Sequence, residues 1–311
     1  MTYSPRPLQR HALPFLLLLT ALLVAAAGLA ACGGNGEQTS SKAGPKVVTS
    51  IDLFADLIRP VAGDRAQVIA VVPSGADPHT YEPIPSKVVD ISEADLVLLN
   101  GLGFEETLAD VIENNVGGGV PVVEMSEGLP VTGLSGQGTG NPHLWLNVRN
   151  TMHYVEVIRD SLIQVDPGGE QMYRANAQTY LAELADLDGQ VEQSIASIPA
   201  ERRRLVTSHD AFPYLAERYG LELVGVVLRS PGQEPSAGDV ADLVRTIAAE
   251  NVPAVFAEPQ FNARVLELAA ADAGVEVCTL YSDAFDDRVR SYMELMRHNA
   301  AELVRCLGGA S

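Results

Sequence analysis

The sequence has little positive charge, little cysteine and a single long apolar run. Its 311 residues carry 21 lysines and arginines against 40 aspartates and glutamates, a formal net charge of −19. Because nucleic-acid binding needs a basic footprint, this balance argues against a nucleic-acid partner. The HExxH pattern of zinc-protease helices is also absent, which removes the plainest sequence signal for a catalytic zinc site.

The long apolar run marks residues 1–31 as a signal segment. Arg6 and Arg10 precede apolar residues 12–31, and small residues lead up to Cys32. This order is typical of a secretory signal, although the run is also long enough for a transmembrane anchor. The small residues before Cys32 and the glycines after it resemble a bacterial lipobox. The resemblance implies that Cys32 is lipidated and that residues 32–45 form a flexible tether. Removing two arginines and no acid takes the net charge from −19 to −21.

The remaining chain is predicted to contain two similar α/β lobes, residues 46–167 and 200–311. Each lobe has short apolar runs rich in β-branched residues, alternating with amphipathic helical patterns. The expected strands are 46–51, 66–72, 94–100 and 120–125, then 203–208, 221–227, 253–258 and 275–280. Near-continuous apolar strands separated by helices favour a parallel sheet covered on both faces. Residues 287–307 are expected to form a closing helix.

A long helix is predicted between the lobes, over residues 168–199. No proline occurs from 168 to 198, and apolar residues recur at steps of three and four. The stripe consists of Tyr173, Ala177, Tyr180, Leu184, Leu187, Val191 and Ile195. Such a helix would be roughly 45 Å long, which predicts a stiff connection rather than a flexible hinge.

Three of the six histidines stand where an apolar strand gives way to a loop. His79, His143 and His209 share this position, and Asp283 also follows a strand directly. Ligands of parallel α/β sheets bind beyond the carboxyl ends of the strands. Three imidazoles and one carboxylate suit zinc or manganese as ligands. Because the four residues come from two lobes, they can converge only in the space between the lobes. The other histidines are expected to be a signal residue and two ordinary helical residues, namely His11, His153 and His298.

Six motifs in order resemble one family, the zinc- and manganese-binding solute-binding lipoproteins of ABC importers. They are "GADPHTYEP", "NPHLWLN", "SHDAFPYLAERYGL", "SPGQEPSAGDVADL", "FAEPQFNARV" and "LYSDAF". The resemblance runs from about Lys46 to Leu307. It implies two α/β lobes joined by a long rigid helix, a metal ion held between them, and delivery of that ion to a membrane permease. Such a protein is not an enzyme, and we expect it to be a monomer outside the cytoplasm.

The resemblance also assigns roles to individual residues. His79 and His143 of the first lobe, with His209 and Asp283 of the second, correspond to the metal ligands. Glu258, in "FAEPQF", is interpreted as a supporting or structural acid rather than a ligand.

Two features of the motifs give opposite indications of which metal ion is bound. Many zinc-specific members carry a histidine-rich loop before the second ligand motif, and "TGLSGQGTG" contains no histidine here. Manganese-preferring members usually resemble "SEGAF" at the third motif, where this chain has His209. We predict Zn²⁺ as the cargo, with Mn²⁺ as the alternative.

Two alternative functions, and the pairing of the two cysteines of the second lobe, stay open at this point. A secreted zinc-dependent hydrolase would need a general base, for which Asp77, Glu82 or Asp210 is available. A surface adhesin or metal chaperone would use the same site. Cys278 and Cys306 either form a disulfide in the second lobe or stay as two buried thiols.

Overall fold

The first lobe is built on a parallel four-stranded sheet. A computed structural model describes residues 1–2, 44–132, 140–228 and 236–309. The strands β1 (Lys46–Thr49), β2 (Gln67–Ala70), β3 (Leu96–Leu99) and β4 (Val122–Glu124) have the order β2-β1-β3-β4. The lobe's helices are α2 (Asp52–Ala62), α3 (Pro85–Ser92), α4 (Glu106–Asn115) and α5 (Val148–Val165), with short turns η1 (Gly63–Arg65) and η2 (Leu144–Leu146).

The second lobe repeats this plan, as predicted. Its strands β5 (Arg204–His209), β6 (Glu222–Leu228), β7 (Ala254–Ala257) and β8 (Glu276–Thr279) are parallel, in the order β6-β5-β7-β8. Its helices are α7 (Pro213–Tyr219), α8 (Ala237–Ala249), α9 (Arg264–Ala273) and α10 (Tyr292–Leu307). All four residues of β7 are buried, which explains why a central parallel strand has an uninterrupted apolar sequence.

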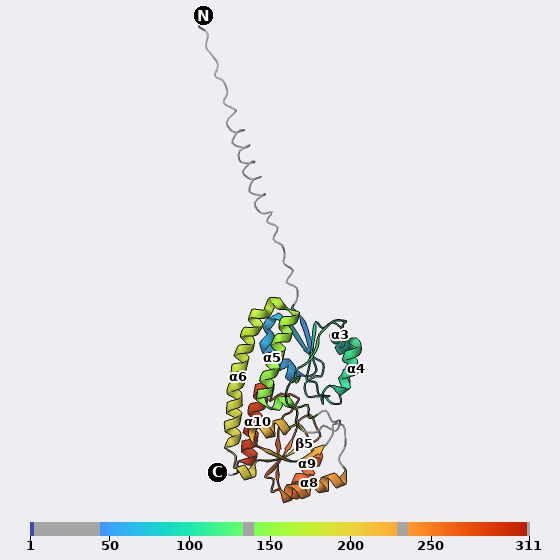
Figure 1. The fold of residues 1–311 in the computed structure, drawn as a ribbon, viewed down its shortest axis with the longest axis vertical. Coiled ribbons are helices and arrows are strands. Elements are labelled where there is room, and N and C mark those ends of the chain that lie inside the picture. The colour runs from blue at the N-terminus through green and yellow to red at the C-terminus, as the bar shows by residue number, and fades with distance from the viewer. Residues whose placement is uncertain (3–43, 133–139, 229–235, 310–311) are drawn as a thin grey trace. The chain divides into compact units, whose positions relative to one another are not determined.

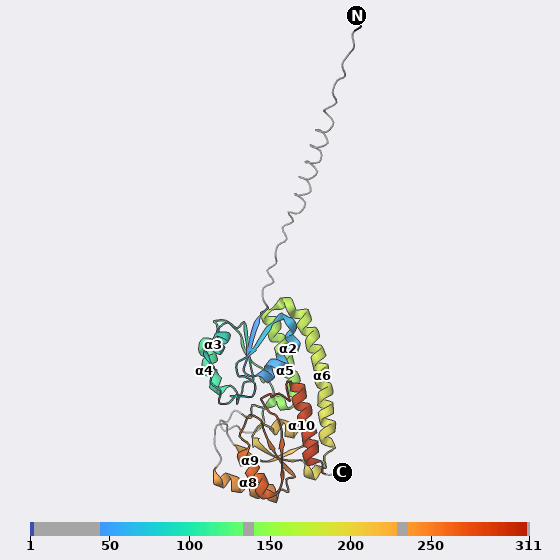
Figure 2. The ribbon, with the colours of Figure 1, turned by 180° about the vertical axis from the view of Figure 1, so that it is seen from behind.

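Helix α6 (Glu170–Ala196) connects the lobes and runs beside both of them (Figures 1 and 2). It lies within the predicted range, between turns η3 (Pro167–Gly169) and η4 (Ala200–Arg202), and its 27 residues correspond to about 40 Å. All seven apolar residues of the predicted stripe are buried.

A buried carboxylate on α6 binds elements on either side of it. Asp188 accepts hydrogen bonds from Arg149 Nε of α5 at 3.1 Å, and from Arg218 Nη2 and Tyr219 Oη of α7 at 2.6 and 3.0 Å. Charge-assisted bonds of this kind are stronger than neutral ones. The long helix is therefore attached through one side chain to a helix of each lobe.

The lobes share one apolar core and a set of hydrogen bonds. One cluster of buried apolar side chains continues from the first lobe along α6 into the second, and a smaller cluster lies between the second sheet and helices α8 and α9. Trp145 Nε1 donates to the carbonyl of Ser282 at 2.8 Å, and Tyr292 Oη donates to the carbonyl of Trp145 at 2.7 Å. The Asp56 carboxylate on α2 accepts the Tyr292 backbone N–H at 2.8 Å, at the start of α10.

In the second lobe, Cys278 of β8 and Cys306 of α10 are joined by a disulfide. The closing helix thus packs back across the sheet, and the bond fixes it there. Arg305, beside Cys306, adds ion pairs to Glu276 at 2.7 Å and Glu302 at 2.8 Å.

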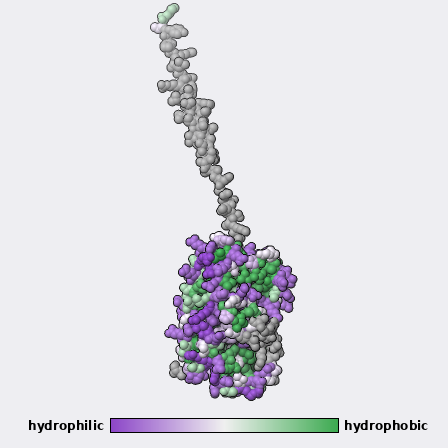
Figure 3. Space-filling model, in the orientation of Figure 1, coloured by the Kyte–Doolittle hydropathy of each residue, from purple (hydrophilic) through white to green (hydrophobic). Residues whose placement is uncertain are grey.

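The surface of the lobes mixes hydrophilic and hydrophobic areas (Figure 3). Within the described ranges no helix is long and apolar enough to cross a membrane. The signal segment, Cys32 and almost all of the tether, residues 3–43, lie outside the described residues.

Candidate metal centre

The predicted ligand residues are brought together between the two lobes. His79 lies in the loop between β2 and α3, and His143 directly precedes η2. His209 is the last residue of β5, and Asp283 lies in the loop after β8. One side-chain nitrogen or oxygen from each of the four lies within 4.8 Å of all the others. His79, His209 and Asp283 therefore lie at or beyond the carboxyl ends of strands, as expected for parallel sheets. His143 differs from the prediction, because it directly precedes η2 and does not follow a strand.

The spacing of these atoms suits one small cation. The Asp283 Oδ2 atom lies 3.5 Å from His79 Nε2, 3.9 Å from His143 Nε2 and 4.0 Å from His209 Nε2. The Nε2 atoms of His143 and His209 are 3.2 Å apart. Donors at tetrahedral positions around zinc are about 3.3 Å from one another. Small side-chain movements would bring all four atoms to that separation.

Asn141 sets the orientation of the His143 ring. Its side-chain Oδ1 accepts the His143 backbone N–H at 3.0 Å and faces His143 Nδ1 at 2.9 Å, while its Nδ2 donates to the carbonyl of Asp210. The amide oxygen of Asn141 carries no proton and can only accept hydrogen bonds, so it accepts from Nδ1 as well as from the backbone N–H. The Nδ1 atom therefore carries the proton, and the Nε2 lone pair faces the cluster.

Glu258 does the same for His209. Its carboxylate lies 2.8 Å from His209 Nδ1 and accepts the His209 backbone N–H at 3.2 Å. A carboxylate behind a ligating imidazole fixes its tautomer and raises its basicity. Glu258 thus stands behind His209 and outside the group of four facing atoms, where the sequence interpretation expected a supporting acid.

The two oxygens of Asp283 have different surroundings. Oδ1 accepts a hydrogen bond from Gln260 Nε2 and lies 3.0 Å from Ser282 Oγ, whose single proton is directed to Glu258 Oε2 at 2.6 Å. Oδ2 is buried, as is His79 Nε2, and neither atom has a hydrogen-bond partner among the described residues. Buried polar atoms without partners are costly. Here both point into the same space between the lobes, so a cation at that point would satisfy them.

Burial and charge shift the pKa values of the buried groups. Burial and the neighbouring His209 and His79 hold the pKa of His143 well below its usual value. Burial also lowers the pKa of His209, but the Glu258 carboxylate outweighs it and raises that pKa to about 9. For Asp283 the burial penalty is outweighed by the nearby His79 imidazole, 3.5 Å away, and by the charge of His209, which lower its pKa to about 2. Asp283 is therefore ionised at neutral pH.

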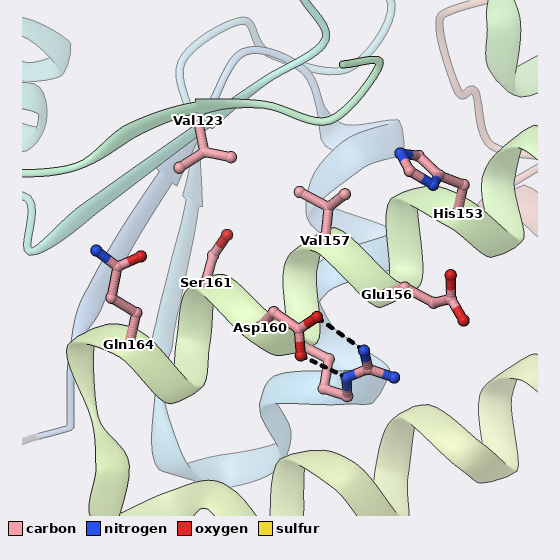
Figure 4. A pocket seen from close by; sticks show the side chains of 8 residues that line it. Val123, His153, Glu156, Val157, Asp160, Ser161 and Gln164 are labelled. Atoms are coloured by element: carbon pink, nitrogen blue, oxygen red, sulfur yellow. Dashed lines mark hydrogen bonds and ion pairs between the residues drawn. The ribbon is translucent and has the colours of Figure 1, made fainter. Parts of the chain in front are cut away.

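Two histidines of the described chain stay away from this centre. His153 Nε2 contacts the Glu127 carbonyl at 2.9 Å, and His298 Nε2 contacts the Thr279 carbonyl at 3.3 Å. His153 lies at the edge of a pocket along α5, where Asp160 pairs with Arg159 (Figure 4). Both residues are thus accounted for by local contacts, as expected.

Several supporting residues were not identified from the sequence. Asn141, Gln260, Ser282 and Trp145 all act on a ligand or on its loop. A signal existed for two of them, since Asn141 stands two residues before His143 and Gln260 two residues after Glu258. Nothing in the sequence connects Trp145 with Ser282, which are 137 residues apart.

Comparison with known proteins identifies the family. Residues 47–306 match the family model ZnuA, described as zinc-uptake complex component A, periplasmic. The chain belongs to this family of metal-binding substrate-binding proteins of ABC importers. It is a binding protein rather than an enzyme, and its partners are a divalent metal ion and an ABC permease. This excludes the hydrolase alternative.

The names of similar proteins mention either manganese or zinc. The manganese-binding lipoprotein MntA of Halalkalibacterium halodurans is 36% identical over 295 residues, covering 93% of this chain and 96% of that protein. The manganese ABC transporter substrate-binding lipoprotein PsaA of Streptococcus pneumoniae is 30% identical, covering 94% and 97%. The structure of the periplasmic zinc-binding protein TroA from Treponema pallidum has a TM-score of 0.79 and 31% identity, covering 86% and 100%.

Proposed function

We propose that this protein captures Zn²⁺ outside the cytoplasmic membrane and delivers it to an ABC permease. The ligands are His79, His143, His209 and Asp283. The observation that carries the proposal is the convergence of three imidazole nitrogens and one carboxylate oxygen from both lobes. Two of these atoms, His79 Nε2 and Asp283 Oδ2, are buried without a hydrogen-bond partner in the part of the chain that the structure describes.

The donor set favours zinc over manganese. Zinc accepts nitrogen ligands in a tetrahedron, whereas manganese is harder and prefers more oxygen ligands. The divalent series also places zinc far above manganese at a nitrogen-rich site. The manganese in the names of MntA and PsaA belongs to those proteins, so the preference of this chain has to be measured.

Competition titration against a chromogenic chelator tests the proposal, with elemental analysis of protein purified without a metal-binding tag. We expect zinc to bind at least about 100-fold more tightly than manganese. His209→Glu should narrow the gap, because it replaces a nitrogen donor by a harder oxygen donor. Equal or tighter manganese binding by the parent protein would overturn the assignment to zinc.

The proposal includes anchoring through a lipid on Cys32 and action as a monomer. The lipoprotein names of the relatives support the anchor. Incorporation of a labelled fatty acid into the parent and not into Cys32→Ala would support it, and equal labelling of the two would contradict it. Sedimentation of the lipid-free form should give the mass of one chain.

A further inference from the structure

Asn100, directly after β3, is fully buried, and both polar atoms of its side chain are hydrogen-bonded. Its Nδ2 atom donates to the carbonyls of Gly101 and Pro142, each at 2.9 Å. Its Oδ1 atom accepts from the hydroxyl of Tyr154, which is buried as well. Both N–H groups of the amide are thus used, and turning the amide over would set its oxygen against two carbonyl oxygens. The side chain is therefore held in one orientation.

The Pro142 carbonyl belongs to the turn that carries His143. The backbone of His143 has φ −84° and ψ 48°, and the Leu144 N–H donates to the Pro142 carbonyl at 2.9 Å. These values describe an inverse γ-turn with His143 at its centre. The planar peptide unit that enters the turn is bonded at both ends, since Asn100 donates to its carbonyl and Asn141 Oδ1 accepts its N–H at 3.0 Å. The backbone that carries the His143 ring cannot turn without breaking one of these bonds.

The second lobe has a buried polar residue at the corresponding place. Strands β3 and β7 are each third in the order of their sheet, and Asn100 and Glu258 are the residues directly after them. Glu258 reaches the ring of His209, which ends the neighbouring strand β5. The Asn100 side chain is shorter by one carbon and reaches the backbone before His143 instead. The two residues therefore support one histidine each, through different contacts.

We propose that Asn100 is a positioning residue for metal binding, and that it acts through His143 alone. By holding the turn, it keeps the Nε2 atom of His143 facing the other ligand atoms before the metal binds. A ligand that is already in place loses less conformational freedom on binding, so the affinity is higher. The inference rests on the proposed function, in which His143 is a metal ligand.

A double-mutant cycle tests this dependence on His143. Zinc affinity is measured by competition titration for Asn100→Ala in the parent, in His143→Ala and in His209→Ala. We expect Asn100→Ala to weaken zinc binding about 10-fold in the parent and in His209→Ala, and to change it by less than about 2-fold in His143→Ala. No loss in the parent, or an equal loss in all three backgrounds, would overturn the proposal, because a purely structural role does not depend on His143.

Asn176→Ala, on α6, is the matched control. It also removes an Nδ2 hydrogen bond to a carbonyl, that of Val61 at 3.1 Å, at a half-buried position outside the group of ligands. Zinc binding should stay unchanged in this variant. A loss as large as that of Asn100→Ala would mean that the effect is not specific to the turn, and would overturn the proposal.

Tyr154→Phe provides the test if Asn100→Ala does not fold. It keeps the buried ring and removes only the hydroxyl that donates to Asn100. We expect a smaller loss of zinc affinity that disappears in His143→Ala. A loss that persists in His143→Ala, or no loss in the parent, would overturn the proposal. If His143→Ala alone binds zinc like the parent, the ligand assignment of the proposed function is wrong, and the inference fails with it.

Discussion

The two lobes hold their halves of the site by different means. In the first lobe, His143 is oriented by a neutral amide, Asn141. The His79 and His143 rings pack against Phe104 with ring centroids 5.1 and 6.0 Å apart. The His79 side chain is also the most exposed of the four, at 10%.

In the second lobe, a buried network of charged and polar groups holds the ligand side chains in place. His209 is backed by the Glu258 carboxylate, and Asp283 accepts a hydrogen bond from Gln260. Ser282 accepts from Gln260 and donates to Glu258, which completes the network. Charge-assisted bonds are stronger and more directional than neutral ones. We infer that the second lobe fixes the charge and geometry of the site, whereas the first supplies two imidazole nitrogens, of which that of His79 lies on a more exposed loop.

The sharpest test of this contrast removes each ligand in turn. His79→Ala, His143→Ala, His209→Ala and Asp283→Ala should each weaken zinc binding by more than the roughly 10- to 100-fold cost of losing a supporting partner. Asp283→Ala should have the largest effect, because it removes the one anionic ligand. Each variant should keep native circular dichroism and lose metal-induced thermal stabilisation. If Asp283→Ala binds like the parent while Glu258→Ala does not, the ligand assignment is wrong.

The disulfide distinguishes the second lobe in stability. Cys278 and Cys306 are 28 residues apart, and closing a loop of that size contributes about 3–4 kcal/mol in the chain-entropy model. The double variant Cys278→Ser/Cys306→Ser should lose about that much free energy of unfolding in denaturant titrations. Two free thiols in the denatured, non-reduced mature protein would contradict the bond.

In the first lobe, a buried acid makes stability depend on pH. Burial raises the pKa of Glu105 to about 7, although Ser50 and the backbone N–H groups of Asn100 and Gly101 donate to it. A raised carboxyl pKa means that the folded state binds more protons than the unfolded state between about pH 4.5 and 7. The contribution to stability is therefore full below pH 4.5 and is lost as pH rises through 7, by about 3 kcal/mol.

Urea titrations at several pH values measure this loss. The stability difference between the parent and Glu105→Gln should fall as pH rises from 4.5 to 8. The exposed Glu113→Gln, on the helix α4 that Glu105 directly precedes, controls for the change in net charge. A difference that stays constant with pH would contradict the prediction.

A smaller difference is expected between the two supporting residues Glu258 and Asn141. Glu258→Gln should weaken zinc binding toward the upper end of the 10- to 100-fold range, and Asn141→Ala toward the lower end. The reason is that glutamine keeps the acceptor oxygen but not the charge behind His209, whereas Asn141 has no charge to lose. The reverse order in competition titrations would mean that the neutral support matters more than the charged one.

The smallest expected effect is motion between the lobes. Since Asp188 binds α6 to α5 and α7, metal should change the radius of gyration by less than about 1 Å. Small-angle scattering of metal-free and loaded protein measures this change. A shift of several ångströms would show that the long helix acts as a hinge.

The fold was predictable because its signals are local. Apolar strands, amphipathic helices and the stripe from Tyr173 to Ile195 each lie within one stretch of sequence. The positions of His79, His209 and Asp283 at or after strands were equally visible, whereas His143 lies before η2 rather than after a strand. The residues that support them were not, because Gln260 and Asp283 meet only when the loops after β7 and β8 lie side by side. The bond from Trp145 to Ser282 depends likewise on how the lobes dock.

The hydrogen bond from the Tyr292 backbone N–H to Asp56 has a consequence for the order of folding. It joins residues 236 positions apart, and the Asp56 carboxylate satisfies one of the otherwise unpaired N–H groups at the start of α10. Helix α10 can take its final place only after α2 has formed and nearly the whole chain has been synthesised. Contacts of such long sequence separation slow folding, since the loop must close before the contact forms. We therefore expect the closing helix to join in the last step of folding, at which the two halves would become one cooperative unit.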